Sequence, residues 1–385
     1  MFDNPFTPLF GGRPGFFFGR EGILRRFDRA MSDYGSDDRA LFITGSRGYG
    51  KTALLEQLST RARAQGRKVI DVGSDNPIGG IMRHLVPFDE ATKTIDPEVE
   101  ISVMGTGGSL RAGSSSKTVR YERDDFEYVF LNACLEDGFK LLVTIDEIQK
   151  VSLDGVSLIS EAFQMASRKG CDAMIAIAGL PYAYEPIIQK NGCAFLRRAS
   201  YEQLGPLSAD EVREALEESF GSIKGISLEK DALELLLRES KGHPYIMQLQ
   251  GYYLIDDINE KVQKRSYRIE VKDVECAMPA VRKAYDSRAL EPLVAAMSRS
   301  EVEYLHAMAG LLGEERTAET GAIAQKMGKS QKQLSTVRAN LVDNGIVGAP
   351  GRGKLAFIIP YLADYILRTE GDANSVVASA LEWGM

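Results

Sequence analysis

The chain has 385 residues, of which 44% are hydrophobic, and a formal net charge of −7 at pH 7. This length predicts two or three domains, and the acidic balance excludes a protein that binds polyanions over its whole surface. No apolar run approaches the ~18 residues of a membrane span, and the N-terminal sequence does not resemble a signal peptide. The four cysteines are scattered and predict neither a metal site nor a disulfide framework. We therefore expect a cytoplasmic protein with no membrane partner.

The first part of the chain predicts an arm, a helix and a buried strand. Residues 1–20 are rich in Phe, Pro and Gly, and we expect this arm to pack on the globular part because so many phenylalanines would not stay solvated. A helix is predicted from residue 21 to about Met31. Ala40–Thr44 is a short apolar run, which is typical of a buried parallel strand.

The segment that follows this strand carries the strongest motif. Residues 45–52 (GSRGYGKT) fit the phosphate-loop pattern G-x-x-x-x-G-K-[ST]. Glycines allow successive backbone N–H groups to turn toward phosphate oxygens, and the amphipathic helix predicted after the loop adds its dipole to the anion site. We expect ATP or ADP to bind here, with Lys51 on the β and γ phosphates and Thr52 on Mg²⁺. The other predicted contacts come from Gly45, Gly48, Tyr49 and Gly50.

A second apolar strand, predicted over residues 141–145, ends in two acids. Ionised carboxylates are costly to bury, so their position at the end of such a strand indicates a use for them. Asp146 is predicted to hold Mg²⁺ through water, and Glu147 to act as the general base that orients the attacking water. A strand that simply emerges into solvent is the alternative, and the phosphate loop makes it the weaker one.

The rest of the nucleotide-binding domain, residues 21–206, alternates strands with helices and predicts a parallel α/β sheet. Residues 73–120 form an insert with a helix over 78–85. Polar and apolar residues alternate on both sides of a Gly/Ser-rich connector, which predicts a hairpin there. A surface loop is the alternative. Residues 207–287 are predicted to be a purely helical lid, with helices at 208–220, 228–240, 244–260 and 271–286.

Residues 288–385 follow the pattern of a winged-helix domain. A first helix is predicted over 300–312, and a helix-turn-helix follows, whose second helix spans 330–343 with Ser330 as its cap. Two wing strands are predicted at 346–347 and 355–357. Six bases and a single acid lie between 326 and 354, an excess that favours duplex DNA. The predicted DNA contacts are Lys332, Gln333, Arg338, Arg352 and Lys354. Winged helices that dock on proteins are the alternative.

With these motifs in order, residues 15–285 resemble P-loop ATPases of the AAA+ and STAND type, with likeness to archaeal-style ATPases and to origin-recognition-type initiators. Phe18-Gly19-Arg20-Glu21 is similar to the segment that packs near the adenine, which implies a nucleotide contact for Arg20. Gly242-His243-Pro244 is similar to a lid motif whose proline contacts the nucleotide, here Pro244. Arg197 and Arg198 stand where the family carries arginine fingers. The alternatives are a plain helix start at Pro244 and a solvated basic pair at Arg197–Arg198.

The chain departs from AAA+ proteins at two positions. Ala178-Gly179 stands where a polar residue usually ends the strand, and Tyr245 replaces the arginine of many lids. Both departures favour the STAND type, and both indicate that ATP hydrolysis is slow.

The sequence therefore predicts a P-loop NTPase fold with a helical lid and a C-terminal winged helix, acting as a switch ATPase. Nucleotide state would control DNA binding, and assembly into a homo-oligomer would depend on nucleotide. The alternative is a nucleotide-gated signalling or defence scaffold that binds an unidentified protein. A small-molecule kinase is weaker because a helical lid and a winged helix replace its short lid.

Overall fold

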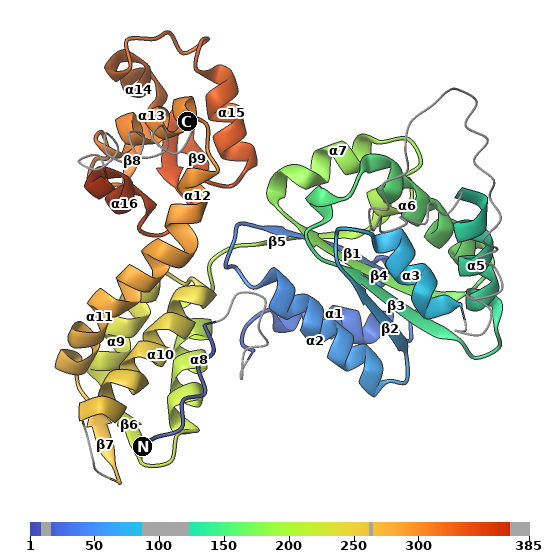
Figure 1. The fold of residues 1–385 in the computed structure, drawn as a ribbon, viewed down its shortest axis with the longest axis horizontal. Helices are drawn as coiled ribbons and strands as arrows, with labels where there is room; N and C mark the ends of the chain where they lie inside the picture. The colour runs from blue at the N-terminus through green and yellow to red at the C-terminus, as the bar shows by residue number, and fades with distance from the viewer. Residues whose placement is uncertain (9–16, 87–122, 262–264, 370–385) are drawn as a thin grey trace, which may run out of the picture.

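The computed structural model describes residues 1–8, 17–86, 123–261 and 265–369 (Figure 1). Among these residues, no helix is long and apolar enough to cross a membrane. The helix expected at the start of the insert is confirmed as α3 (Pro77–Leu85), while the hairpin predicted after it lies outside the described residues.

A sheet of five parallel strands forms the centre of the nucleotide-binding part, in the order β2-β3-β4-β1-β5. This confirms the predicted α/β class. The strands are β1 (Ala40–Gly45), β2 (Lys68–Val72), β3 (Lys140–Ile145), β4 (Asp172–Gly179) and β5 (Ser200–Leu204). β5 was not predicted, because an edge strand with one solvated face lacks the continuous apolar run of a buried strand.

Helices cover both faces of this sheet, as Figure 1 shows. Leu41 and Ile43 of β1 point to one group of helices, and Phe42 between them points to the other. The first group is α1 (Glu21–Ala30) and α2 (Lys51–Ala64). The second is α3, α5 (Arg123–Leu135), α6 (Leu153–Arg168) and α7 (Tyr184–Gln189). The helices bury the strands on both faces of the sheet. The strand ends remain uncovered by these helices and form two edges, one where the strands begin and one where they end.

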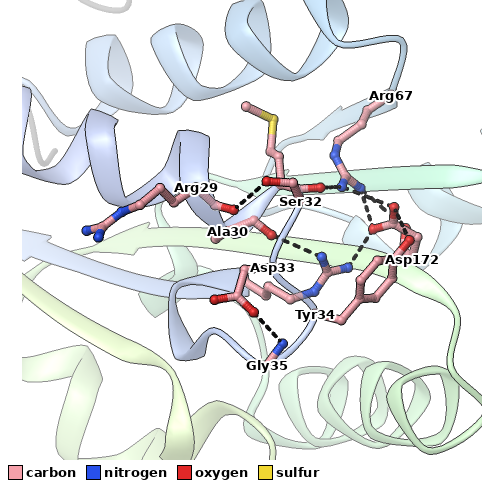
Figure 2. Close-up of polar contacts among 10 residues, drawn as sticks. Arg29, Ala30, Ser32, Asp33, Tyr34, Gly35, Arg67 and Asp172 are labelled. Atoms are coloured by element: carbon pink, nitrogen blue, oxygen red, sulfur yellow. Dashed lines mark hydrogen bonds and ion pairs between the residues drawn. The ribbon is translucent and has the colours of Figure 1, made fainter.

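The edge where the strands begin is closed by a buried ion cluster around Asp172, the first residue of β4 (Figure 2). Its Oδ1 accepts hydrogen bonds from Arg39 at 2.5 Å and Arg67 at 2.7 Å, and its Oδ2 accepts one from the Tyr34 hydroxyl at 3.1 Å. Burial alone would raise the pKa of the Asp172 carboxyl, but hydrogen bonds from Arg67 and Arg39 bring it below its ordinary value. The cluster ties the segments before β1, β2 and β4 together.

The helical unit follows β5, and its helices agree with the predicted positions. They are α8 (Ala209–Gly221), α9 (Lys230–Ser240), α10 (Pro244–Lys261) and α11 (Val271–Tyr285). The expectation of a purely helical unit is wrong, because β6 (Ile226–Leu228) and β7 (Tyr267–Ile269) form a small parallel sheet. Strands of three residues are too short to show a period in the sequence. The N-terminal arm packs here through Phe2 and Phe6.

Within residues 299–369, the C-terminal unit has four helices and the three-stranded antiparallel sheet β8-β10-β9. Its elements are α13 (Arg299–Ala309), β8 (Thr317–Glu319), α14 (Thr320–Lys326), α15 (Ser335–Asp343), β9 (Val347–Gly351), β10 (Lys354–Phe357) and α16 (Leu362–Thr369). Helix α15 begins at Ser335 rather than at residue 330. Ser330 and Gln333 do exchange the predicted hydrogen bonds, but they close a turn that precedes the helix.

The helical and C-terminal units share one apolar core. A π-helix (Asp286–Leu290) and α12 (Glu291–Ala295) continue from α11, so the predicted boundary at 287/288 falls inside an unbroken helical run. Tyr245 and Ile246 of α10 belong to the same cluster of buried side chains as Tyr304 and Leu305 of α13. The placement of the C-terminal unit is therefore set by packing and not by a linker alone.

Candidate nucleotide site

The phosphate loop lies at the edge where the strands end, between β1 and α2. Gly48 has a φ of 81° and Gly50 a φ of 87°, which side chains rarely allow. A Cβ atom on Gly48 would lie 2.3 Å from the Cε1 atom of His243, so the loop fits against the lid only with glycine there. Gly48 is therefore needed for packing as well as for backbone conformation, whereas Gly50, with no atom within 4 Å of such a Cβ, is needed for conformation.

Lys51 is almost completely buried, with 6% of its surface exposed. Its Nζ donates to the carbonyl oxygens of Gly45 at 2.8 Å and Ser46 at 3.1 Å. Burial lowers the pKa of the Lys51 ammonium, and the nearby carboxylates of Glu147 and Asp146 oppose that shift. A buried ammonium held by two carbonyl dipoles is suited to an anionic ligand.

The two acids stand beside the loop, as the sequence predicted. Asp146 Oδ2 accepts a hydrogen bond from the Thr52 hydroxyl at 2.5 Å, and its Oδ1 accepts one from the Glu147 amide at 2.8 Å. Hydroxyl and carboxylate oxygens in contact are the hard donors that Mg²⁺ prefers, so this pair fits the predicted ion. Glu147 follows with a φ of 55°, a left-handed conformation for a residue other than glycine.

His243 joins the helical unit to the phosphate loop. Its Nε2 lies 3.2 Å from the carbonyl oxygen of Arg47, and because a carbonyl only accepts, Nε2 carries the proton. Burial lowers the pKa of the imidazole to about 4, so it is neutral at pH 7. Pro244 and Tyr245, which follow it, line the same cavity, and so does Arg288 from the π-helix.

Arg20 lies on the other side of the cavity, at the start of α1. Its guanidinium donates to the Gly205 carbonyl and its backbone amide to Glu211. Burial lowers the pKa of Arg20, partly offset by the charge of Glu211. Phe17 and Phe18 beside it supply apolar surface.

The C-terminal unit closes the site. The Ser46 hydroxyl donates to the Gly345 carbonyl at 2.9 Å, and the Tyr49 hydroxyl donates to the Ile358 carbonyl at 3.2 Å. Leu341 and Asn344, at the end of α15, also line the cavity. Two residues of the phosphate loop therefore hold the C-terminal unit directly, which nothing in the sequence indicated.

All three units thus enclose one cavity of about 650 Å³. Among the described residues, five cations and two acids line it, an excess of positive charge that suits a polyphosphate. The charged residues are Arg20, Arg47, Lys51, Lys150, Arg288, Glu147 and Glu301.

Arg197 and Arg198 lie away from this cavity. Both are exposed in a 3₁₀ helix (Leu196–Arg198) that precedes β5, and Arg197 donates to the Ile188 carbonyl at 2.8 Å. Neither is found among the described residues that line the cavity. The structure thus does not bring them to the site of their own chain.

The predicted DNA contacts come from the turn before α15, from α15 itself and from the wing between β9 and β10. Lys332, Gln333 and Arg352 are exposed, while Arg338 is half-buried on α15. Lys354 forms an ion pair of 3.0 Å with Glu315, an acid that lies outside the segment 326–354 in which the charges were counted. The wing therefore carries less free positive charge than its sequence suggests.

Gln149 and Arg288 are among the polar residues at the site that sequence reasoning missed. Gln149 hydrogen-bonds to Glu147, and Arg288 brings a guanidinium to the lid beside Tyr245, where the sequence showed no arginine. The position of Gln149, two residues after the acids, was a signal that could have been followed. Arg288 could not have been found, because a π-helix after α11 turns it toward the cavity.

Solved structures with a similar fold include an ORC2 protein and a Cdc6p protein. The chain is 16% identical to the Aeropyrum pernix ORC2 protein in its ADPNP–ADP complexes, with a TM-score of 0.63 over 93% of both chains. The ADP form of that protein has 15% identity and a TM-score of 0.53, over 91% of this chain and 93% of that one. Cdc6p from Pyrobaculum aerophilum has 15% identity and a TM-score of 0.48, over 91% and 93%.

The two ORC2 matches confirm the predicted resemblance to origin-recognition-type proteins at the level of the fold. Residues 288–366 also match a family described as a domain of unknown function, DUF8462. The comparison with curated proteins found no match.

Proposed function

We propose that this protein is a slow, Mg²⁺-dependent ATPase that couples its nucleotide state to the binding of duplex DNA by a C-terminal winged helix. The observation that carries the proposal is the contact of the C-terminal unit with the phosphate loop, through Ser46 and Gly345. A nucleotide that enters the loop meets this contact directly. Its binding energy can therefore act on the position of the C-terminal unit.

The role of Lys51 is the first test of nucleotide binding. The Lys51→Ala variant should bind a fluorescent ATP analogue about 10- to 100-fold more weakly, because a hydrogen bond to a charged group contributes about 1.5–3 kcal/mol. Lys224→Ala, which removes an exposed lysine of the helical unit, is the control and should bind like the parent. Equal affinities for the parent and Lys51→Ala would show that the site is assigned wrongly.

Helix α15 supplies the proposed link between nucleotide and DNA. Its carboxyl end, with Leu341 and Asn344, lines the nucleotide cavity. The residues at and before its amino end, Lys332 and Gln333, are exposed and suited to a DNA groove. A rigid helix that touches the nucleotide site at one end and DNA at the other would transmit a small displacement without a separate device.

The wing gives a test of DNA contact with an internal comparison. Arg352→Ala should flatten the dependence of log K on log salt by about one unit, because one phosphate contact is lost. Lys354→Ala should flatten it less, since Glu315 already neutralises that lysine. A parent that does not shift duplex DNA at low salt, with or without ATP, would contradict the proposal.

We further propose that Arg197 or Arg198 acts on the nucleotide of a neighbouring subunit. Their exposure and their distance from the cavity of their own chain support this arrangement. An arginine finger raises the rate about 10³–10⁵-fold. Turnover per subunit should therefore rise with protein concentration, and it should stay flat in the variant that has lost the finger. Flat turnover in the parent would leave both residues as surface charges.

A protein-binding scaffold remains the second candidate. The pairing of Lys354 with Glu315 favours it, because it removes one of the positive charges that DNA would need. In that case nucleotide would still alter the C-terminal unit, and DNA would not bind.

A further inference from the structure

Gln149 forms a bridge between the predicted general base and the end of a neighbouring strand. Its side-chain Nε2 donates to Glu147 Oε2 at 2.7 Å, and its Oε1 accepts a hydrogen bond from the Leu180 amide at 3.1 Å. Leu180 directly follows β4. One amide group thus fixes the Glu147 carboxylate relative to the backbone at the edge of the sheet.

The local backbone brings the two side chains together. The left-handed conformation of Glu147 starts a 3₁₀ helix (Ile148–Lys150), in which Ile148 is buried with 1% of its surface exposed. Ile148 points into the core, and the side chains of Glu147 and Gln149 on either side of it meet in the hydrogen bond.

Gly179 leaves the room that the bridge needs. A Cβ atom at this position would lie 2.9 Å from Gln149 Oε1 and 2.6 Å from Ile148 Cγ2. A polar side chain at position 179 could therefore not coexist with the bridge. The residue after the strand, Leu180, contributes a backbone N–H instead, and Gln149 links it to Glu147.

From this geometry we infer that Gln149 is the positioning residue for Glu147 in ATP hydrolysis. It holds Oε2 and orients the carboxylate so that Oε1 accepts the proton of the attacking water. The water oxygen then bonds to the γ-phosphorus as the bond to the leaving ADP oxygen breaks. This inference rests on the proposed ATPase function and names the residue that replaces the missing polar group of β4.

The test compares two hydrogen-bonded Gln–Glu pairs. Gln149→Met keeps the length of the side chain and removes the amide, and it should lower the single-turnover rate about 10- to 100-fold, the scale of a misplaced catalytic group. Affinity for ATP should stay within twofold, because Gln149 touches the carboxylate and not the phosphate loop. Gln189→Met is the matched control, since Gln189 donates to Glu185 at 2.9 Å on the exposed side of α7.

A double variant separates positioning from a structural role. If Gln149 acts through Glu147, Gln149→Met should slow the Glu147→Gln protein no further. Independent structural damage would instead multiply the two losses. Gln149→Glu keeps the acceptor for the Leu180 amide but sets a second carboxylate against Glu147, so it should fold normally and also be slow.

The outcomes distinguish this inference from the function on which it rests. A parent that binds ATP and does not hydrolyse it overturns both. If Gln149→Met hydrolyses ATP as fast as the parent, only the role of Gln149 is overturned. The same holds if the losses multiply in the double variant.

Discussion

The two edges of the central sheet use buried charge in opposite ways. Where the strands begin, Asp172 is surrounded by Arg39, Arg67 and Tyr34, so each buried charge meets its partner within the chain (Figure 2). Where the strands end, the cations outnumber the acids among the described residues around the cavity, and the Lys51 ammonium donates to two carbonyl oxygens near the carboxylates of Glu147 and Asp146. The first edge stabilises the fold, and the second leaves a charge imbalance that an anionic ligand would correct.

The largest expected effect is at the second edge. Glu147→Gln should lower turnover of ATP about 10²–10⁴-fold, the usual contribution of a general base, and leave ATP affinity and unfolding temperature unchanged. Steady-state turnover, nucleotide titration and thermal unfolding measure these three quantities. Normal turnover would show that this carboxylate takes no part in hydrolysis.

Removing the buried acid of the first edge should have the opposite effect: it should lower the stability of the fold and leave ATP binding unchanged. Asp172→Ala leaves two buried guanidinium groups without their carboxylate, which should lower the free energy of unfolding by about 3–5 kcal/mol. The folded fraction should still bind ATP like the parent, because Asp172 lies at the opposite edge from the phosphate loop. Asp154→Ala is the control, since Asp154 forms an exposed ion pair with Lys190. A loss of ATP affinity in the Asp172 variant would show that the two edges are coupled.

The sequence predicted the parts of the second edge that depend on neighbouring residues. The phosphate loop and the acids after β3 were found because each motif is continuous and follows a strongly apolar strand. The order of the strands then brings Gly45, Asp146 and Leu180 to one edge.

Contacts between distant residues could not be predicted. Gln149 meets Leu180, and Ser46 meets Gly345 almost 300 positions later, only after the chain has folded. The Asp172 cluster was missed for the same reason. Arg39 and Arg67 precede strands, where charged residues are ordinary, and nothing local shows that both meet one carboxylate.

Acid should weaken the two edges at different pH values. The pKa of His243 is lowered from its ordinary 6.5 to about 4, so between these values the unfolded chain binds a proton that the folded protein does not. The contribution of His243 to stability is thus complete above pH 6.5 and is lost as pH falls, by about 1.4 kcal/mol per pH unit. The pKa of Asp172 is also lowered, so its contribution is lost only in stronger acid.

Denaturant unfolding at several pH values measures this difference. His243→Gln retains a side-chain donor for the Arg47 carbonyl and cannot titrate, so it should reduce the slope between pH 6.5 and 4 by that amount. His84→Gln, at an exposed histidine, is the control. An unchanged slope in His243→Gln would mean that the imidazole does not stay neutral in the folded protein.

The smallest expected effect concerns the contact between the phosphate loop and the C-terminal unit, and two glycines allow it to be isolated. Gly345 has a φ of 67°, and a Cβ atom there would lie 2.5 Å from Ser46 Oγ. Gly138, before β3 at the first edge, has a φ of 72° and no atom within 4 Å of such a Cβ. Alanine should cost both sites about 1–2 kcal/mol of backbone strain, but only Gly345→Ala should push the C-terminal unit off Ser46.

The measured quantity is the factor by which ATP changes DNA affinity, which by linkage equals the factor by which DNA changes ATP affinity. In Gly138→Ala this factor should match the parent, because strain at the first edge does not reach the loop. In Gly345→Ala it should fall toward one, since the contact that transmits the nucleotide state is displaced. If both variants kept the parent's factor, the coupling would have to pass through the helical unit and His243 instead.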